Sequence, residues 1–503
     1  MDIPLHIRKD GSLTFQDQLY RQIRDGILSG RIPRGFKLPS SRDLAHDLSI
    51  SRNTVTLAFA WLINEGYLES RTGAGTFVSR ILPEEALGIT HETTGGALAG
   101  GAGRDNVRPP ILFRSPAPAM IDRSKPRPSI DFWYGRLDHR HFPLKIWRRL
   151  VMENLSRAGP NLSDYANPAG NPELRAAIAE HLGATRGMRV TAERIIITAG
   201  AQEGVNLLAR LLVGPGTRVA VEDPGYQAAA TVLQSHGAEL CPIQVDEGGL
   251  DVEELGALSG VSLLHVTPSH QFPSGATMPL ERRVALLGWA RLAGAYIIED
   301  DYDSDFRYDG PPLASLAGLD GNDRVIYLGT FSKSVGAGLR LGYLVLPPEL
   351  VGPATAAKSL GSYGQAWLDQ AILCDFIRTG AYGRHLRRLR QAYRRSRDAL
   401  AGAMRLHFGN DVGIHGQDAG MHIMWTLPDG SADALAVAAA AAKRGVGIYP
   451  FPAVGAVEYG PRGMACRNLV LGYSSLSPAE IRAGIAQLAA VVAELGHSTK
   501  LAP

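Results

Sequence analysis

The first 80 residues carry short runs of regularly spaced apolar residues that are separated by turns. Apolar side chains recur every four positions at Phe15, Leu19, Ile23 and Ile27. This spacing is typical of one helix face, so we expect a helix over residues 13–29. Two further helices are expected over residues 42–48 and 51–64, with Ser41 and Ser51 as their N-caps. Residues 67–70 and 75–78 predict two strands that a hairpin tip joins. The order predicts a compact winged helix-turn-helix.

From residue 129 onward, helical segments alternate with short apolar runs. Buried strands are expected at residues 194–198, 218–221, 262–266, 296–298 and 325–328. Such alternation predicts an α/β domain with a mainly parallel central sheet. Ligands of these sheets bind beyond the carboxyl ends of the strands.

Residues 81–128 show no apolar period and are rich first in glycine and then in proline. Glycine makes a chain flexible, and proline makes it extended and stiffer. We therefore expect three parts: a head at residues 1–80, a linker at 81–128 and a body at 129–503.

Composition adds only broad limits. The 503 residues are 45% hydrophobic and 20% charged, with a net charge of +3, which is ordinary for a globular protein. The three cysteines are scattered, so neither a disulfide framework nor a zinc site is expected. No signal peptide and no run of about 18 apolar residues is present, which predicts a cytoplasmic protein without a membrane span.

The head has residue types that suit DNA. The second helix of a helix-turn-helix lies in the major groove with its N-terminal residues against base edges. Those residues are Ser51, Arg52, Asn53, Thr54 and Thr56. Arg42 and Arg71 suit the backbone phosphates, and Gly75 of the hairpin completes the expected DNA-binding set. The charge of this region is only 11 basic minus 8 acidic residues, or +3. A small helical docking domain is the alternative.

The body has residue types that suit pyridoxal 5'-phosphate (PLP). Asp300 closes one apolar run, and Lys333 follows the next one. A lysine forms the Schiff base with this cofactor, and a carboxylate keeps the ring nitrogen protonated. The cofactor-binding set would also include Gly200, Ala201, Gln202, Thr330, Ser332 and Arg340 at the phosphate, Tyr226 stacked on the ring, and Tyr302 at the ring oxygen. A metal site is the alternative for the acidic run at residues 299–305, although no phosphate-transfer motif accompanies it.

The motifs of the head resemble one protein family, and those of the body resemble another. PSSRDLA (39–45), SRNTV (51–55), EGYL (65–68) and GAGTFV (73–78) resemble the DNA-binding domain of GntR-type bacterial repressors. YANPAG (165–170), EDDYD (299–303) and the segment from Ser332-Lys333 to RLGY (340–343) resemble fold-type I aminotransferases. Together they resemble the MocR/GabR subfamily of bacterial transcription regulators. The resemblance implies a PLP-binding regulator that binds an operator in double-stranded DNA as a head-to-tail homodimer.

Two departures from the aminotransferase pattern bear on activity. Phe272 stands where aminotransferases carry the asparagine of Asn-Pro-Thr-Gly, so His270 or Gln271 would take over its hydrogen bond. Val470 stands where they carry the arginine that binds the substrate carboxylate, and Arg467 lies three residues earlier. We therefore expect a sensor of a small amine, amino acid or vitamin B6 compound. An active aminotransferase with an accessory DNA-binding domain and a PLP-free scaffold are the alternatives.

An arginine-rich stretch at residues 384–397 is expected to be helical. It is either a solvated face that pairs with acids across the dimer or a second DNA-contacting patch.

Overall fold

The computed structural model describes residues 5–7, 13–71, 73–83, 127–309, 314–321 and 324–499. The chain divides into two compact units, Met1–Pro109 and Pro110–Pro503. Most of the expected linker, residues 84–126, lies outside the described residues. The boundaries at residues 80 and 128 therefore stay predictions.

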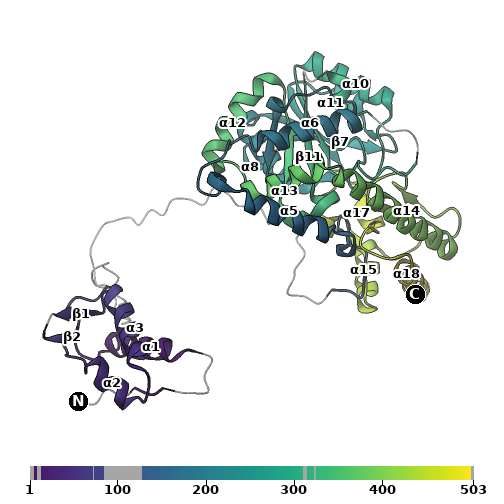
Figure 1. Ribbon diagram of the computed structural model, residues 1–503. Helices are drawn as coiled ribbons and strands as arrows, with labels where there is room; N and C mark the ends of the chain where they lie inside the picture. The colour runs from purple at the N-terminus through teal and green to yellow at the C-terminus, as the bar shows by residue number, and fades with distance from the viewer. Residues whose placement is uncertain are drawn as a thin grey trace, which may run out of the picture. The chain divides into compact units, whose positions relative to one another are not determined.

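The N-terminal unit has three helices followed by a hairpin, in the expected order (Figure 1). Its elements are α1 (Phe15–Leu28), α2 (Ser41–Asp47), α3 (Arg52–Asn64), β1 (Leu68–Arg71) and β2 (Gly75–Val78). The two strands are antiparallel and pair Leu68 with Val78 and Arg71 with Gly75. The predicted inward faces form one apolar core, which includes Leu19, Ile23, Val55, Ala58 and Leu62.

The cap of α2 differs from the prediction. Ser40, and not Ser41, has the extended backbone of an N-cap, and its hydroxyl accepts a hydrogen bond from the Asp43 amide at 3.2 Å. Ser41 is the first residue of the helix. Both serines are good caps, so the sequence could not decide between neighbours. Ser51 caps α3 as predicted, accepting from the Thr54 amide at 3.1 Å.

The body is built on an eight-stranded sheet in the order β4-β12-β11-β10-β9-β5-β7-β8. The strands are β4 (Ile195–Thr198), β5 (Arg218–Asp223), β7 (Glu239–Asp246), β8 (Gly249–Leu250), β9 (Val261–Val266), β10 (Tyr296–Asp301), β11 (Val325–Thr330) and β12 (Gly342–Val345). Neighbours from β7 to β11 are parallel, whereas β12 runs antiparallel to both β11 and β4. The predicted α/β fold with a mainly parallel sheet is confirmed.

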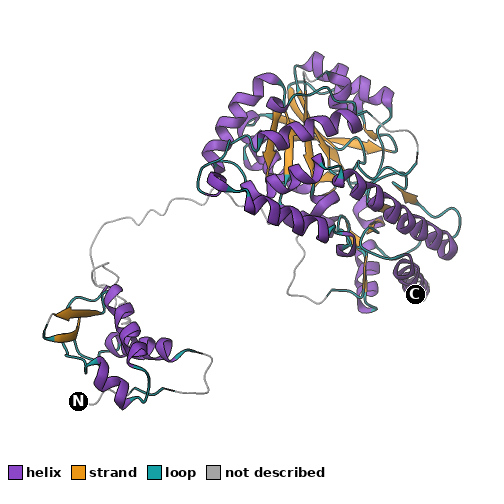
Figure 2. Cartoon of the chain, viewed as in Figure 1, coloured by secondary structure: helices purple, strands orange, loops and turns teal. Residues whose placement is uncertain are grey.

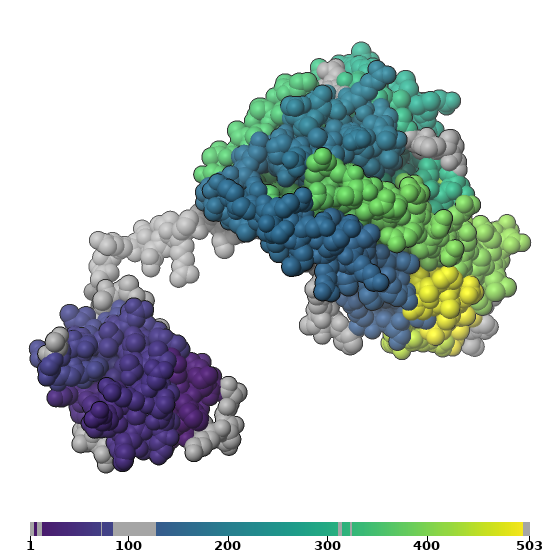
Figure 3. Space-filling view, in the orientation of Figure 1, coloured from purple at the N-terminus to yellow at the C-terminus, as the bar shows by residue number. Residues whose placement is uncertain are grey.

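Helices cover the strands of this sheet (Figure 2). The longer ones are α5 (Leu144–Ser156), α6 (Pro172–Arg186), α7 (Ala201–Leu212), α8 (Gln227–Ser235), α10 (Leu280–Ala293), α12 (Pro348–Ser362), α13 (Trp367–Arg378) and α14 (Ala381–Phe408). The short helices are α9 (Val252–Gly256) and α11 (Leu316–Asp320). The chain of α5 and α6, in blue, and that of α13, in green, form neighbouring bands on one face (Figure 3). The rings of Trp147 and Phe376 join α5 to α13 at a centroid distance of 5.8 Å.

A second, antiparallel sheet follows in the order β13-β14-β18-β16. Its strands are β13 (Ile414–His415), β14 (His422–Thr426), β16 (Tyr449–Pro450) and β18 (Asn468–Gly472). Helices α15 (Ala434–Lys443), α16 (Phe451–Val454), α17 (Met464–Arg467) and α18 (Pro478–Thr499) accompany it. Two-residue strands complete the body: β3 (Ile130–Asp131) pairs β15 (Val446–Gly447), and β6 (Gly225–Tyr226) pairs β17 (Ala456–Val457). None of the helices in the described part of the chain is long and apolar enough to cross a membrane.

Candidate cofactor site and DNA-binding head

The carboxyl ends of β10 and β11 bring Asp300 and Lys333 to the same edge of the sheet. The two strands are parallel neighbours, and Asp300 pairs with Leu328 in their register. β11 ends at Thr330, and Lys333 follows in a short helical turn, Ser332–Gly336. Both side chains line one cavity of about 210 Å³.

Most of the predicted cofactor residues line this cavity. They are Ala201, Gln202, Tyr226, Asp300, Tyr302, Thr330, Ser332, Lys333 and Arg340. Tyr134, Thr267, Phe272 and Ala337 also line it, and of these the sequence reasoning had marked only Phe272. The apolar run that ends at Tyr134 after the linker was the one available signal.

Asp300 has a carboxylate oxygen without a partner. Its Oδ1 is buried and makes no hydrogen bond to any residue that the structure describes, while its Oδ2 lies 3.4 Å from His265 Nε2. A buried oxygen left unpaired is costly unless a ligand satisfies it. The N–H of a protonated pyridine ring is the kind of donor that it lacks, so the site fits PLP.

Aromatic rings form a wall of the cavity. Phe272 lies with its centroid 5.0 Å from that of Tyr134 and 5.8 Å from that of Tyr226, edge-on to the latter. Burial raises the pKa of Tyr226 to about 12, so its hydroxyl stays protonated. An uncharged aromatic wall of this kind suits a planar ring.

Lys333 lies close to the chain at Gly135. Its Nζ is 5.3 Å from the Tyr134 ring centroid, and a Cβ on Gly135 would stand only 2.3 Å from it. Burial lowers the pKa of Lys333, and the charges of Asp303 and Asp300 oppose this change. Desolvation therefore favours the neutral amine, which is the nucleophilic form.

The start of α7 offers backbone donors at the other end of the cavity. Gly200 has φ +90° and precedes Ala201, the first residue of the helix. A Cβ on Gly200 would lie 3.0 Å from an Arg340 guanidinium nitrogen. Arg340 donates to the Ala199 carbonyl at 2.5 Å, and the Thr330 hydroxyl donates to that of Ser332 at 3.0 Å. Helix N-termini with a nearby guanidinium favour phosphate.

The role of His270 or Gln271 in place of the missing asparagine stays a prediction. Neither residue is part of the lining. The Gln271 amide donates to the Pro224 and Phe272 carbonyls at 2.9 and 2.6 Å. His270 instead contacts Tyr302, with 3.1 Å between Nδ1 and the hydroxyl oxygen. This contact of His270 with Tyr302 could not be predicted from the sequence, because it joins two loops.

The acidic run is divided among different partners. Glu299 accepts from the amides of Leu316 and Ala317 at 2.8 and 2.9 Å, and Asp301 pairs with Arg186 at 3.1 Å. Of this run, only Asp303 joins a group of possible metal ligands within the described chain, together with His270 and His422.

The expected position of a carboxylate clamp is apolar. Val470 is buried in β18. Arg467 ends α17, and its guanidinium binds Asp429 at 2.5 Å and the Leu427 carbonyl at 3.0 Å. Among the cavity-lining residues described here, Arg340 is the one arginine, and it lies beside Gly200, next to the start of α7.

The head presents the predicted DNA-binding residues at the start of α3 and on its neighbours. Arg42, Ser51, Arg52, Asn53, Thr56, Arg71 and Gly75 are exposed, and Thr54 is half-buried. The Arg71 guanidinium lies 4.7 Å from the Phe77 ring centroid. Lys37, which the sequence reasoning did not single out, packs its side chain against Gly75 and Phe77. Two basic side chains, Lys37 and Arg71, therefore lie near Phe77 in the hairpin.

Comparisons with known proteins agree with both units. Residues 15–78 match the gntR family of bacterial regulatory proteins, and residues 134–461 match aminotransferase class I and II. The chain is 35% identical over 499 residues to the probable rhizopine catabolism regulatory protein MocR of Rhizobium meliloti, covering 99% of this chain and 97% of that protein. It is 34% identical over 492 residues to the HTH-type transcriptional regulator YdeL of Bacillus subtilis, covering 97% and 99%.

The body is also similar to solved aminotransferases. The kynurenine aminotransferase of Pyrococcus horikoshii superimposes with a TM-score of 0.66 at 28% identity, covering 74% of this chain and 92% of that one. A GntR-type head on a fold-type I aminotransferase body defines a class of DNA-binding transcription regulator. The chain belongs to its MocR/GabR subfamily. Class I and II aminotransferases use PLP.

Proposed function

We propose that the body of this regulator binds PLP at Lys333 and senses a small amine, amino acid or vitamin B6 compound there. The observation that carries the proposal is the cavity in which Lys333, the unpartnered oxygen of Asp300 and the start of α7 meet. A lysine, an acceptor for a ring N–H and a phosphate site are the three features that the cofactor needs.

The bound cofactor supplies an electron-withdrawing ring that a lysine holds through its aldehyde carbon. Lys333 would provide that nitrogen, and Asp300 would accept the hydrogen bond of the ring N–H. Tyr302 would donate to the ring oxygen, and Tyr226 would cover the ring. Thr330, Ser332, Arg340 and the first amides of α7 would hold the phosphate.

The effector is expected to compete for the position that Lys333 occupies. The cavity has no arginine beyond the phosphate end among the lining residues described above. A carboxylate on the effector would therefore gain little from charge pairing. We infer that the amino group and the shape of the effector, more than its carboxylate, decide binding.

Regulation requires that the effector prefers one arrangement of the protein. Equal affinity for both arrangements would shift neither. We propose that a head-to-tail homodimer carries two heads to an operator in double-stranded DNA, and that effector binding at Lys333 changes how these heads engage it.

The test is a titration of the purified full chain with amines and amino acids, followed by visible absorbance and by operator binding. We expect a visible band that one class of compound shifts, with a parallel change in operator affinity. Lys333→Ala should lack the band and the response.

The proposal fails if Lys333→Ala leaves operator binding and effector response unchanged. Steady turnover of an amino donor with a keto acid would instead support the active aminotransferase.

A further inference from the structure

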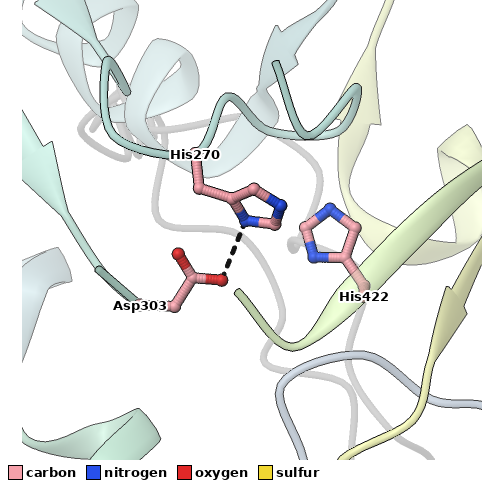
Figure 4. Close-up of side chains that lie close together, drawn as sticks. All are labelled: His270, Asp303 and His422. Carbon is pink, nitrogen blue, oxygen red and sulfur yellow. Dashed lines mark hydrogen bonds and ion pairs between the residues drawn. The ribbon is translucent and has the colours of Figure 1, made fainter. Parts of the chain in front are cut away.

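Three buried polar side chains, His270, Asp303 and His422, lie close together (Figure 4), and His270 contacts Tyr302. His270 follows β9, Asp303 follows β10, and His422 begins β14. They are 1%, 3% and 1% exposed, so water does not compete for their hydrogen bonds. The proposed function uses none of the three.

One nitrogen of His270 faces two partners. Its Nδ1 lies 3.0 Å from Asp303 Oδ2 and 3.1 Å from the Tyr302 hydroxyl oxygen. An ionised carboxylate only accepts hydrogen bonds. Nδ1 must then carry the proton, and it faces both oxygens as a donor. The hydroxyl oxygen of Tyr302 accepts, so the tyrosine's own proton is free to point elsewhere.

The other ring nitrogen supports the same tautomer. His270 Nε2 is buried and has no partner among the described residues. Buried N–H groups without an acceptor are rare, and unpaired buried acceptors are less so. A bare Nε2 therefore costs less than an Nε2–H in this position, which again places the proton on Nδ1.

His422 adds no proton to the group. Its Nε2 donates to the Pro273 carbonyl at 3.2 Å, which leaves Nδ1 bare. Burial lowers the pKa of His422 well below its ordinary value. The two imidazole centroids are 4.7 Å apart, so a neutral His422 spares His270 a like charge.

Near Tyr302, the side chains of Phe272 and Thr267 offer no free hydrogen-bond donor to the cavity. Phe272 offers no donor, and Thr267 is already committed, because its hydroxyl donates to Glu222 at 2.6 Å and accepts from the Phe272 amide at 3.1 Å. The direction of one hydroxyl proton therefore decides whether this edge of the cavity can donate a hydrogen bond.

We propose that Asp303 and His270 are positioning residues that direct the hydroxyl proton of Tyr302 into the cavity, toward the ring oxygen of the cofactor. The identity of the ligand in this inference rests on the proposed function, whereas the hydrogen-bond geometry around Tyr302 does not. The opposite tautomer would draw the proton back to His270 and leave only a lone pair for the ring oxygen.

The same three side chains are of types that bind metal ions. Glycine backbone closes on His270, however. A Cβ on Gly275 or Gly416 would stand 3.0 or 3.2 Å from Nε2, and one on Gly420 would stand 2.2 Å from Nδ1. The Nε2 atom of His270, which a metal ion would have to bind, is therefore packed against glycine backbone. Zinc binding is nevertheless an outcome that the test must report.

The first arm of the test uses the full chain without cofactor. The ¹⁵N spectrum of histidine-labelled protein reads the tautomer of each ring, and His270→Gln identifies the His270 signals. A protonated Nδ1 with a bare Nε2 is expected. The Nε2–H form would overturn the proposal, as would stoichiometric zinc binding that His422→Gln abolishes. This arm decides the matter even if no cofactor binds.

The second arm uses the PLP-loaded protein and the pH midpoint of its visible absorbance change. Tyr302→Phe should raise this midpoint by about one pH unit, the usual effect of losing a hydrogen bond to a charged group. Asp303→Asn also removes a charge, so its effect is compared in the native and Tyr302→Phe backgrounds. The through-space charge effect is common to both and cancels in the difference.

A difference of about one pH unit between the two backgrounds is the expected result. Equal shifts in both would mean that Asp303 acts by charge or packing alone and would overturn the proposal. Asp303→Leu serves as a second variant if Asp303→Asn does not fold, with the same expectation.

Discussion

Single atoms define the cofactor site more sharply than the general shape of the cavity does. The Oδ1 atom of Asp300 is buried and has no hydrogen bond to any described residue. Folded proteins satisfy nearly all buried polar groups. Because this oxygen belongs to a residue that lines the cavity, a ligand is the simplest source of the missing partner.

Removing the Asp300 carboxylate should weaken cofactor binding. A hydrogen bond to a charged group contributes about 1.5–3 kcal/mol, so Asp300→Ala should lower PLP affinity at least about ten-fold. Titration of the cofactor-free variant with PLP measures the change. Asp429→Ala, which removes a surface carboxylate that pairs with Arg467, is the matched control and should keep native affinity. Native affinity in Asp300→Ala would contradict the assignment.

Glu222 should make the stability of the body depend on pH. Burial raises its pKa to about 7, although the Thr267 hydroxyl and amide donate to it. The folded body then holds a proton that the unfolded chain releases above its ordinary pKa of 4.5. The stabilisation is complete below about pH 4.5 and is lost as the pH rises through 7.

The contribution is on the order of 3 kcal/mol. Thermal unfolding of the native protein and of Glu222→Gln between about pH 5 and pH 8 tests this pH dependence. The variant should show a flatter dependence of Tm on pH, and identical slopes would refute the expectation.

At the scale of elements, parallel strands explain why part of the site was predictable. Their carboxyl ends share one edge, so Asp300 and Lys333 could be placed together from their positions after two apolar runs. Tyr134 could not be placed, because it reaches the cavity from a segment far away in the chain. The same holds for His270, whose position depends on loops rather than on strand order.

Strand β7 is an element of the fold that was not predicted from the sequence. It alternates between buried and partly exposed residues and contains Pro242, a residue that argues against a strand interior. No continuous apolar run marked it. Strand β12 was noticed only as part of the RLGY motif (340–343) and was not predicted as a strand.

The contact between β11 and β12 should tolerate no side chain at Gly329. This residue pairs with Tyr343, and a Cβ here would stand 2.2 Å from the tyrosine ring. Gly329→Ala should therefore destabilise the body by about 1–3 kcal/mol and disturb the turn that carries Lys333. Thermal unfolding and PLP affinity measure both effects. Gly338→Ala, where no heavy atom lies within 4 Å, is the control and should behave like the native protein.

At the scale of the whole molecule, DNA binding should depend on charge at the start of α3. Arg52 is exposed at the first position of that helix. Losing a base-edge contact costs about 1–3 kcal/mol, so Arg52→Ala should weaken operator binding and relax specificity at one base pair in each half-site. Binding to a set of single-base operator variants measures this. A uniform loss across all variants would mean that Arg52 contacts phosphate only.

Any contribution of the basic face of α14 to DNA binding can be measured separately from that of Arg52. Arg387, Arg388 and Arg395 are exposed, whereas Arg390 donates to the Asp305 carbonyl and Arg397 pairs with Asp309. Each phosphate contact adds about 0.9 to the slope of log affinity against log salt. If α14 is only a solvated face, Arg387→Gln with Arg388→Gln should leave the slope unchanged. A smaller slope would show a second DNA-contacting patch.

The pairing of Arg467 with Asp429 has a consequence for handedness. An enzyme that acts on amino acids distinguishes mirror images because it fixes the amino group, the carboxylate and the side chain at three separate points. With Val470 in the clamp position and Arg467 turned to Asp429, neither of these two described residues gives the effector carboxylate a fixed point. The regulator should then respond to the D and L forms of an effector at similar concentrations, as a detector of chemical class rather than of chirality.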